Sequence, residues 1–193
     1  VFWLIMTGID ESSGWSNSKI IKRESEINKI YKFFKFEKFY NLNYPTTLLD
    51  RIDSVDIINQ IKNILSLVKP NIIYLPFIND PHSDHRITTE SFNSCIKPFR
   101  HSHIDKILMY ETLSETNLNF LSDRKFNPNY FIDISKNIKK KINAMKIYKS
   151  EISTHPFPRS EESIYSLAKL RGSQVNLNLA EAFELVYEIK KNK

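Results

Sequence analysis

The first hundred residues alternate short apolar runs with longer amphipathic segments. Three runs, VFWLIMT, KFYNLNY and NIIYLPF, are rich in β-branched and aromatic residues, as buried strands are. Between them, apolar residues recur with helical period over residues 19–36, with Ser18 as the expected N-cap, and over residues 55–69. This alternation is typical of repeated strand-helix units, in which each helix returns the chain to a parallel strand. The sequence therefore predicts an α/β fold.

The second half of the chain carries weaker signals. The closing run LAEAFELVYEI alternates apolar and polar residues at its centre, which favours a strand over a helix. Gly172 is expected to end the last helix, because glycine is common just after a helix C-terminus. With 193 residues, of which 41% are hydrophobic, the chain can bury the core of one domain over residues 1–193. We further expect helices over 88–96, 136–148 and 161–170, and strands over 105–112 and 130–135.

The charge balance is basic, with a formal net charge of +6. Clustered lysines would suggest a nucleic-acid partner, but here they are spread along the chain. The densest group, SKNIKKKINAMKIYKS, has apolar residues at helical spacing, so its lysines are most simply the solvated face of an amphipathic helix. No RNA-binding or helix-turn-helix pattern is present. We therefore expect no nucleic-acid partner, although an anionic substrate would suit the charge equally well.

The cysteine content and the N-terminal sequence indicate the cellular compartment of the protein. Its one cysteine, Cys95, cannot form an internal disulfide and is interpreted as a small buried hydrophobic residue of a reducing compartment. The opening run VFWLIM is too short to span a membrane and lacks the flanks of a signal peptide. We expect a cytoplasmic protein without a transmembrane segment, and a homo-oligomer remains open.

One stretch stands out chemically. PFINDPHSDHRI follows the third predicted strand and brings two aspartates and two histidines within six residues. In a parallel α/β sheet, ligands bind outside the carboxyl ends of the strands. A neutral imidazole is a good zinc ligand whose second nitrogen needs an acceptor, and Asp80 and Asp84 are candidates. The alternative is a polar surface loop, since the spacing does not match the helical zinc-protease pattern.

The segment PHSDHR after KPNIIYLPF resembles the second signature of the LmbE-like or PIG-L family of zinc-dependent N-deacetylases, a His-x-Asp-His sequence after a central strand. The resemblance implies a Rossmann-like three-layer fold with a mainly parallel sheet. It also implies hydrolysis of the N-acetyl group of an N-acetylated amino sugar or its conjugate. Further segments match the family in order along nearly the whole chain: RESE, YPTTLLD, YETLSET, FIDIS, KIYKSE, HPFPRS and RGSQVNLNLAEAF.

The resemblance also implies roles for single residues. His85 would bind Zn²⁺, which polarises the acetamide carbonyl and activates a bound water. His82 would protonate the leaving amine or stabilise the oxyanion, with Asp84 holding its imidazole. We therefore expect the Asp84 or Asp80 carboxylate within hydrogen-bonding reach of His82.

Four other residues are candidates for substrate binding. Arg23 and Asp50 occupy positions where the family lines its substrate pocket, but Arg23 could equally pair with Glu26 on the same helix face. His155 and Arg159 could reach a sugar or phosphate group, unless HPFPRS is only a proline-stiffened surface loop. We expect this loop to lie beside the crevice that holds the histidines.

One family signature has no counterpart in the chain. His-Pro-Asp-Asp supplies two more zinc ligands and the general base in the family, and it occurs nowhere in this sequence. Because VFWLIMTGIDE resembles the family's second strand, we expect the missing signature upstream of Val1, and an N-terminally truncated, inactive chain. The alternative is a catalytically dead relative that binds sugar or serves as a scaffold.

Overall fold

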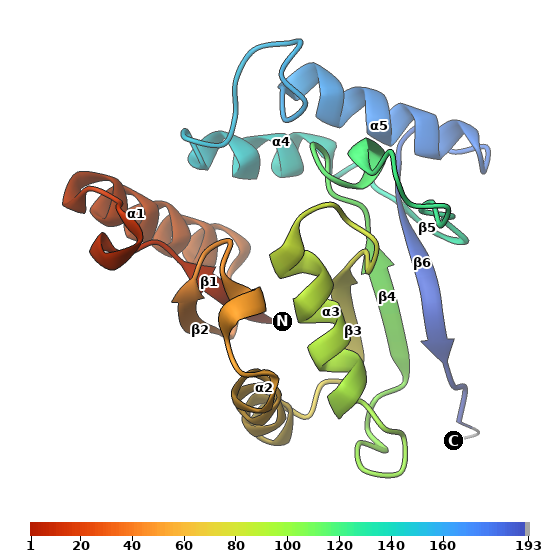
Figure 1. The fold of residues 1–193 in the computed structure, drawn as a ribbon. Helices are drawn as coiled ribbons and strands as arrows, with labels where there is room; N and C mark the ends of the chain where they lie inside the picture. The colour runs from red at the N-terminus through yellow and green to blue at the C-terminus, as the bar shows by residue number, and fades with distance from the viewer. Residues whose placement is uncertain (192–193) are drawn as a thin grey trace. The chain divides into compact units, whose positions relative to one another are not determined.

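The computed structural model describes residues 1–191 and contains two compact units, each built from two stretches of chain (Figure 1). Unit 1 comprises Val1–Thr46 and Phe131–Glu181, and unit 2 comprises Thr47–Tyr130 and the residues from Ala182 onward. The predicted single domain over residues 1–193 stays a prediction.

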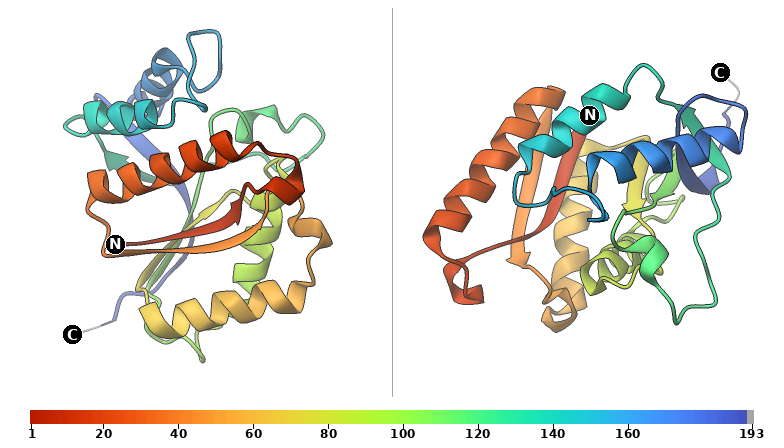
Figure 2. Two further views of the ribbon diagram at one scale, coloured as in Figure 1. Left: turned by 90° about the vertical axis from the view of Figure 1, so that its left-hand side faces the viewer. Right: turned by 90° about the horizontal axis from the view of Figure 1, so that it is seen from above.

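Unit 1 begins with a strand-helix-strand element, as the sequence predicts. Strand β1, Phe2–Gly8, pairs in parallel with β2, Lys38–Pro45, and helix α1, Asn17–Phe34, connects them. A short 3-10 helix, η1, covers Glu11–Ser13. In the second stretch, α4, Ile138–Ile147, packs against α1 and against α5, Glu161–Ser173 (Figure 2). The buried apolar residues of this unit include Ile30, Ile134, Ile138, Ile142, Ile164, Ala168 and Leu179.

Unit 2 holds the predicted strand NIIYLPF and the motif that follows it, but this strand lies at the edge of the described sheet and not at its centre. Its elements are the 3-10 helix η2, Leu49–Arg51; α2, Ser54–Val68; β3, Ile72–Pro76; α3, Ser83–Cys95; β4, Lys106–Tyr110; and the 3-10 helix η3, Thr116–Leu118. Helix α3 packs against β3 and α2. Apolar residues spaced along both helices and strands build its core: Leu49, Ile57, Ile61, Leu65, Ile73, Leu75, Phe77, Phe92, Cys95, Leu108 and Met109.

The larger sheet has the strand order β3-β4-β6-β5, where β5 spans Tyr130–Asp133 and β6 spans Ala180–Glu188. β3 and β4 are parallel, whereas β4 and β6 are antiparallel. The predicted α/β fold is confirmed, with a mixed rather than purely parallel sheet. An alternating pattern identifies a strand but carries no information about its direction, which is why the antiparallel strand was not foreseen.

Most helix ends differ from the sequence prediction by one to three residues, and three differences bear on the fold. The N-cap of α1 is Ser16 rather than Ser18. Helix α3 begins at Ser83, five residues before the predicted start, because the polar motif itself forms its first turn. Helix α5 continues through Gly172 to Ser173, and a Cβ on Gly172 would lie 2.5 Å from the carbonyl oxygen of Leu177. That glycine allows a close approach of two backbones instead of ending the helix.

Candidate active site

The turn between β3 and α3 places the motif at the carboxyl end of β3, which is an edge strand of the described four-stranded sheet. After Pro76 the chain stays bonded to the sheet, since the Phe77 N–H donates to the Tyr110 carbonyl at 3.1 Å. The Thr89 hydroxyl donates to the Pro76 carbonyl at 2.8 Å, which fastens α3 to the end of β3. The motif side chains are thus held by packed elements rather than by a free loop, at the sheet edge where the sequence predicts a site.

Asp80 orients the ring of His85. The Asp80 side chain is fully buried, and its Oδ2 lies 2.8 Å from Nδ1 of His85, whose side chain is 26% exposed. A carboxylate only accepts, so Nδ1 of His85 carries the proton and Nε2 of the neutral ring keeps its lone pair. Within the described chain, the other carboxylate oxygen, Oδ1, has no hydrogen-bond partner. His85 therefore presents an Nε2 lone pair, with a carboxylate at the other ring nitrogen as metal-ligating histidines usually have.

His82 has the opposite arrangement of ring nitrogens. It is the N-cap of α3, and its Nδ1 accepts a hydrogen bond of 3.2 Å from the main-chain N–H of Asp84. The neutral ring must then carry its proton on Nε2, which becomes a donor. The rings of His82 and His85 are stacked, with centroids 4.8 Å apart and planes inclined by 15°. The two neighbouring rings thus differ in what they offer a ligand: His82 offers a hydrogen-bond donor at Nε2, and His85 offers a lone pair at Nε2.

Asp84 has a different contact from the one expected. Its buried carboxylate accepts from the Thr47 N–H at 2.7 Å and from the Leu49 N–H at 3.3 Å. The contact with His82 comes from the main chain of Asp84 instead of its carboxylate. The side chain therefore ties the segment before η2 to the first turn of α3, where a negative charge also suits the helix dipole.

The residues fit zinc only in part. His85 with the buried Asp80 behind it has the arrangement of a metal ligand and its orienting carboxylate. A catalytic zinc, however, takes three protein ligands, and in the described part of the chain no group of three His, Cys, Asp or Glu side chains could hold a metal ion. The described residues therefore do not complete a zinc site.

Asp50 lies in η2 and is exposed to solvent. It lines a hollow of about 300 Å³ between η2, α2 and α3, together with Ile87 and Glu90. Neither His82 nor His85 is among the residues that line this hollow. Asp50 and the histidines thus belong to the same unit but to different surfaces of it.

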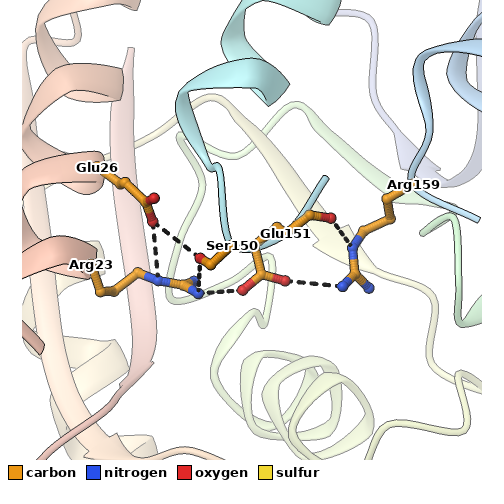
Figure 3. Close-up of polar contacts among 5 residues, drawn as sticks. All are labelled: Arg23, Glu26, Ser150, Glu151 and Arg159. Carbon is orange, nitrogen blue, oxygen red and sulfur yellow. Dashed lines mark hydrogen bonds and ion pairs between the residues drawn. The ribbon is translucent and has the colours of Figure 1, made fainter. Parts of the chain in front are cut away.

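A charged cluster in unit 1 contains two of the other predicted residues (Figure 3). Arg23 and Arg159 both bind the carboxylate of Glu151, Arg159 through an Nη2–Oε2 contact of 3.0 Å. Arg159 also donates from Nε to the main-chain oxygen of Glu151 at 2.8 Å. Arg23 in addition forms an ion pair of 3.6 Å with Glu26, and Ser150 bridges both of these residues. The pairing of Arg23 with Glu26 that the helix spacing allowed is present.

Glu151 was not predicted, although it lies in the quoted segment KIYKSE. Its contacts close the base of the loop between α4 and α5, which leaves His155 exposed between them. Next to this cluster, burial of the Tyr148 side chain raises its pKa to about 12. The charge of Arg23 opposes this shift, whereas the charges of Glu26 and Glu151 add to it. These residues belong to unit 1 and the histidines to unit 2, so the expected position of the loop beside the histidines stays a prediction.

Residues 6–96 match the family model described as PIG-L, GlcNAc-PI de-N-acetylase. This segment of the chain, just under half of its length, is similar to the PIG-L family. It includes Arg23, Asp50 and both histidines of the motif, whereas Glu151, His155 and Arg159 follow it in the sequence.

Solved structures with the same fold extend over nearly the whole chain. A conserved protein from Thermus thermophilus has a TM-score of 0.73 at 17% identity, covering 98% of this chain and 83% of its own. The N,N'-diacetylchitobiose deacetylase of Pyrococcus horikoshii has a TM-score of 0.70 at 20% identity, covering 97% and 73%. The 4-carboxy-2-hydroxymuconate hydratase of Pseudomonas putida has a TM-score of 0.70 at 14% identity, covering 100% and 86%. These likenesses show that the fold reaches beyond the segment that matches the PIG-L model, and that proteins with this fold include both a deacetylase and a hydratase.

Proposed function

We propose that this protein removes the N-acetyl group from an N-acetylated amino sugar or its conjugate. The proposal rests on one observation above all, the stacked pair of imidazoles in which His82 presents a donor nitrogen and His85 a lone pair. The match to the PIG-L model, described by its de-N-acetylase activity, and the deacetylase fold support it.

His82 is the proposed general acid. Amide hydrolysis adds water to the acetamide carbonyl, breaks the C–N bond and releases acetate and an amine, which must gain a proton as it leaves. The Nε2–H of the neutral His82 ring can donate a hydrogen bond to the oxyanion of the tetrahedral intermediate. Transfer of a proton to the leaving nitrogen requires the imidazolium form, in which Nδ1 has also taken up a proton and has released the Asp84 N–H, so that the ring returns to neutral as the amine leaves. In the neutral ring, the main-chain bond from Asp84 to Nδ1 keeps the proton on Nε2.

His85 is the proposed metal ligand, with zinc as the metal. Zinc would polarise the acetamide carbonyl and lower the pKa of a bound water. Asp80 would keep Nε2 of His85 free to bind and would make that nitrogen more basic. Since the described residues bring no group of three donors together, the metal would need ligands beyond them.

Arg23, Asp50, His155 and Arg159 are the proposed substrate-binding residues. The exposed His155 can contact a ligand without rearrangement, whereas both arginines already bind Glu151. Substituting Arg159→Ala should therefore raise the Michaelis constant more than it lowers the unfolding temperature. An unchanged Michaelis constant would leave Arg159 with the structural role of closing the loop.

The test of the proposed function is release of a primary amine from N-acetylglucosamine and its conjugates by this protein, followed with an amine-reactive dye. His82→Ala should lower turnover by about 10²–10⁴-fold, the usual contribution of a general acid. His101→Ala is the matched control. It also removes an imidazole from unit 2, but this imidazole contacts His103 and not the motif. Equal turnover in the two variants would refute the role of His82.

A second function is a sugar-binding protein without catalysis, favoured by the lack of a group of three metal donors in the described chain. Such a protein should bind N-acetylglucosamine conjugates in calorimetry and release no amine, with or without added zinc. Amine release that depends on His82 excludes it.

A further inference from the structure

The net positive charge of the protein lies in one unit. In unit 2 the basic and acidic residues are equal in number, so the whole formal net charge of +6 belongs to unit 1. A charge concentrated in this way creates a local field, whereas a charge spread evenly over the surface does not.

The excess is found on two helices of unit 1. Six exposed lysines form what we call the basic face: three on α1, two in the first turn of α4, and one just before that helix. Among the described residues none of the six forms an ion pair with a carboxylate. Other lysines of α4 are neutralised, since Lys141 pairs with Glu181 and Lys146 with Glu161. The lysines of the basic face are Lys22, Lys29, Lys32, Lys136, Lys139 and Lys140.

The two groups of lysines adjoin each other. Helices α1 and α4 pack together and lie side by side in both views of Figure 2. The ammonium group of Lys140 lies 5.3 Å from the ring centroid of Phe34 and 6.0 Å from that of Phe33, so Lys140 reaches the last turn of α1. On α1, Lys22 and Lys29 are two helical turns apart on one side of the helix.

An apolar residue also lies on the solvent side of α1. Ile21 is 60% exposed and directly precedes Lys22 in the sequence of the helix. An exposed apolar side chain among flexible lysines suits the boundary of a bilayer, where it can enter the headgroup region while the ammonium groups contact phosphates.

We propose that the basic face of unit 1 docks onto a membrane surface that contains anionic lipids. All its cations are lysines, which act as point charges toward any array of phosphates. Sequence-selective or single-strand nucleic-acid sites rely instead on arginine forks and on aromatic rings open to stacking. Here Phe33 and Phe34 pack against each other with centroids 5.2 Å apart, and Lys140 covers them. The proposal is independent of the deacetylase function.

Vesicle co-sedimentation tests this docking directly. At low salt the protein should pellet with phosphatidylcholine vesicles that contain about a third phosphatidylserine, should stay in solution with pure phosphatidylcholine, and should dissociate in high salt. Each lysine near such a surface contributes about fivefold to affinity, so Lys136→Glu with Lys139→Glu should weaken binding at least about 25-fold. Glutamates at the start of α4 suit its dipole, so the variant should stay folded.

The matched control makes the same change of charge elsewhere. Lys97→Glu with Lys190→Glu replaces two exposed lysines of unit 2 and should bind anionic vesicles as the unchanged protein does. Three results would overturn the proposal: no binding to anionic vesicles at low salt, equal loss of binding in the two double variants, or tighter binding to a short duplex DNA or single-stranded RNA than to the vesicles. The last result would make a nucleic acid the partner of this face.

Discussion

Substituting Asp84→Ala should lower the free energy of unfolding, because the Asp84 side chain joins two segments that are distant in the sequence. It removes a buried acceptor from the N–H groups of Thr47 and Leu49, at 2.7 and 3.3 Å. A hydrogen bond to a charged group contributes about 1.5–3 kcal/mol, and the longer of the two bonds lies at or below the low end of that range. The expected loss in the free energy of unfolding is about 3 kcal/mol, which is a shift of about 1.5 M in the urea midpoint for a slope near 2 kcal/mol per M.

The measurement is urea unfolding followed by circular dichroism, with Asp56→Ala as the matched control. Asp56 lies in the first turn of α2 as Asp84 does in that of α3, so it shares the dipole interaction, but it is exposed. Its loss should cost about 0.5 kcal/mol. Asp84→Asn keeps one acceptor and should fall between the two. If Asp84→Ala and Asp56→Ala have the same midpoint, the tethering role is wrong.

Three further predictions concern metal binding, packing and pH. Asp80→Ala should weaken zinc binding about 10–100-fold in calorimetry, whereas Asp80→Asn, which still accepts from His85, should weaken it less; equal losses would contradict an orienting role. Gly172→Ala should lower the free energy of unfolding by about 2 kcal/mol, because its Cβ would meet the Leu177 carbonyl oxygen at 2.5 Å, and an unchanged thermal midpoint would show that the backbone yields freely. The hydrogen bond from Lys106 lowers the pKa of Glu188, so its stabilisation is complete above the unfolded value of about 4.3 and is lost as the pH falls through the lower folded value. Glu188→Gln should therefore flatten the fall of the thermal midpoint between about pH 4.5 and 3, and parallel pH curves would refute this.

Local patterns in the sequence were sufficient to predict the strands and most helices. Runs such as NIIYLPF and the period of α2 are set by burial on one side of each element, which the order of residues records directly. The start of α3 was missed because its first turn consists of polar side chains with tasks in the site, and His82 is not one of the common N-cap residues.

The contacts of the site depend on residues that are distant in the sequence. Thr47 and Leu49 approach Asp84 from 37 and 35 positions away, and Glu151 meets Arg23 across 128 positions. Hydrophobic periodicity is a local signal and carries no information about pairs of residues that are distant in the sequence. The local contact between Asp80 and His85, five residues apart, could be anticipated because imidazole needs an acceptor at its second nitrogen.

The most direct test of the division of labour between the two histidines is to measure bound zinc and turnover together in His85→Ala and His82→Ala. Metal analysis and amine release from an N-acetylglucosamine conjugate are carried out on the same preparations of the protein. The orientation of the two rings predicts that His85→Ala loses both zinc and turnover, whereas His82→Ala keeps its zinc and loses turnover by about 10²–10⁴-fold. Zinc and turnover retained in His85→Ala, or zinc lost equally from both variants, would contradict the account.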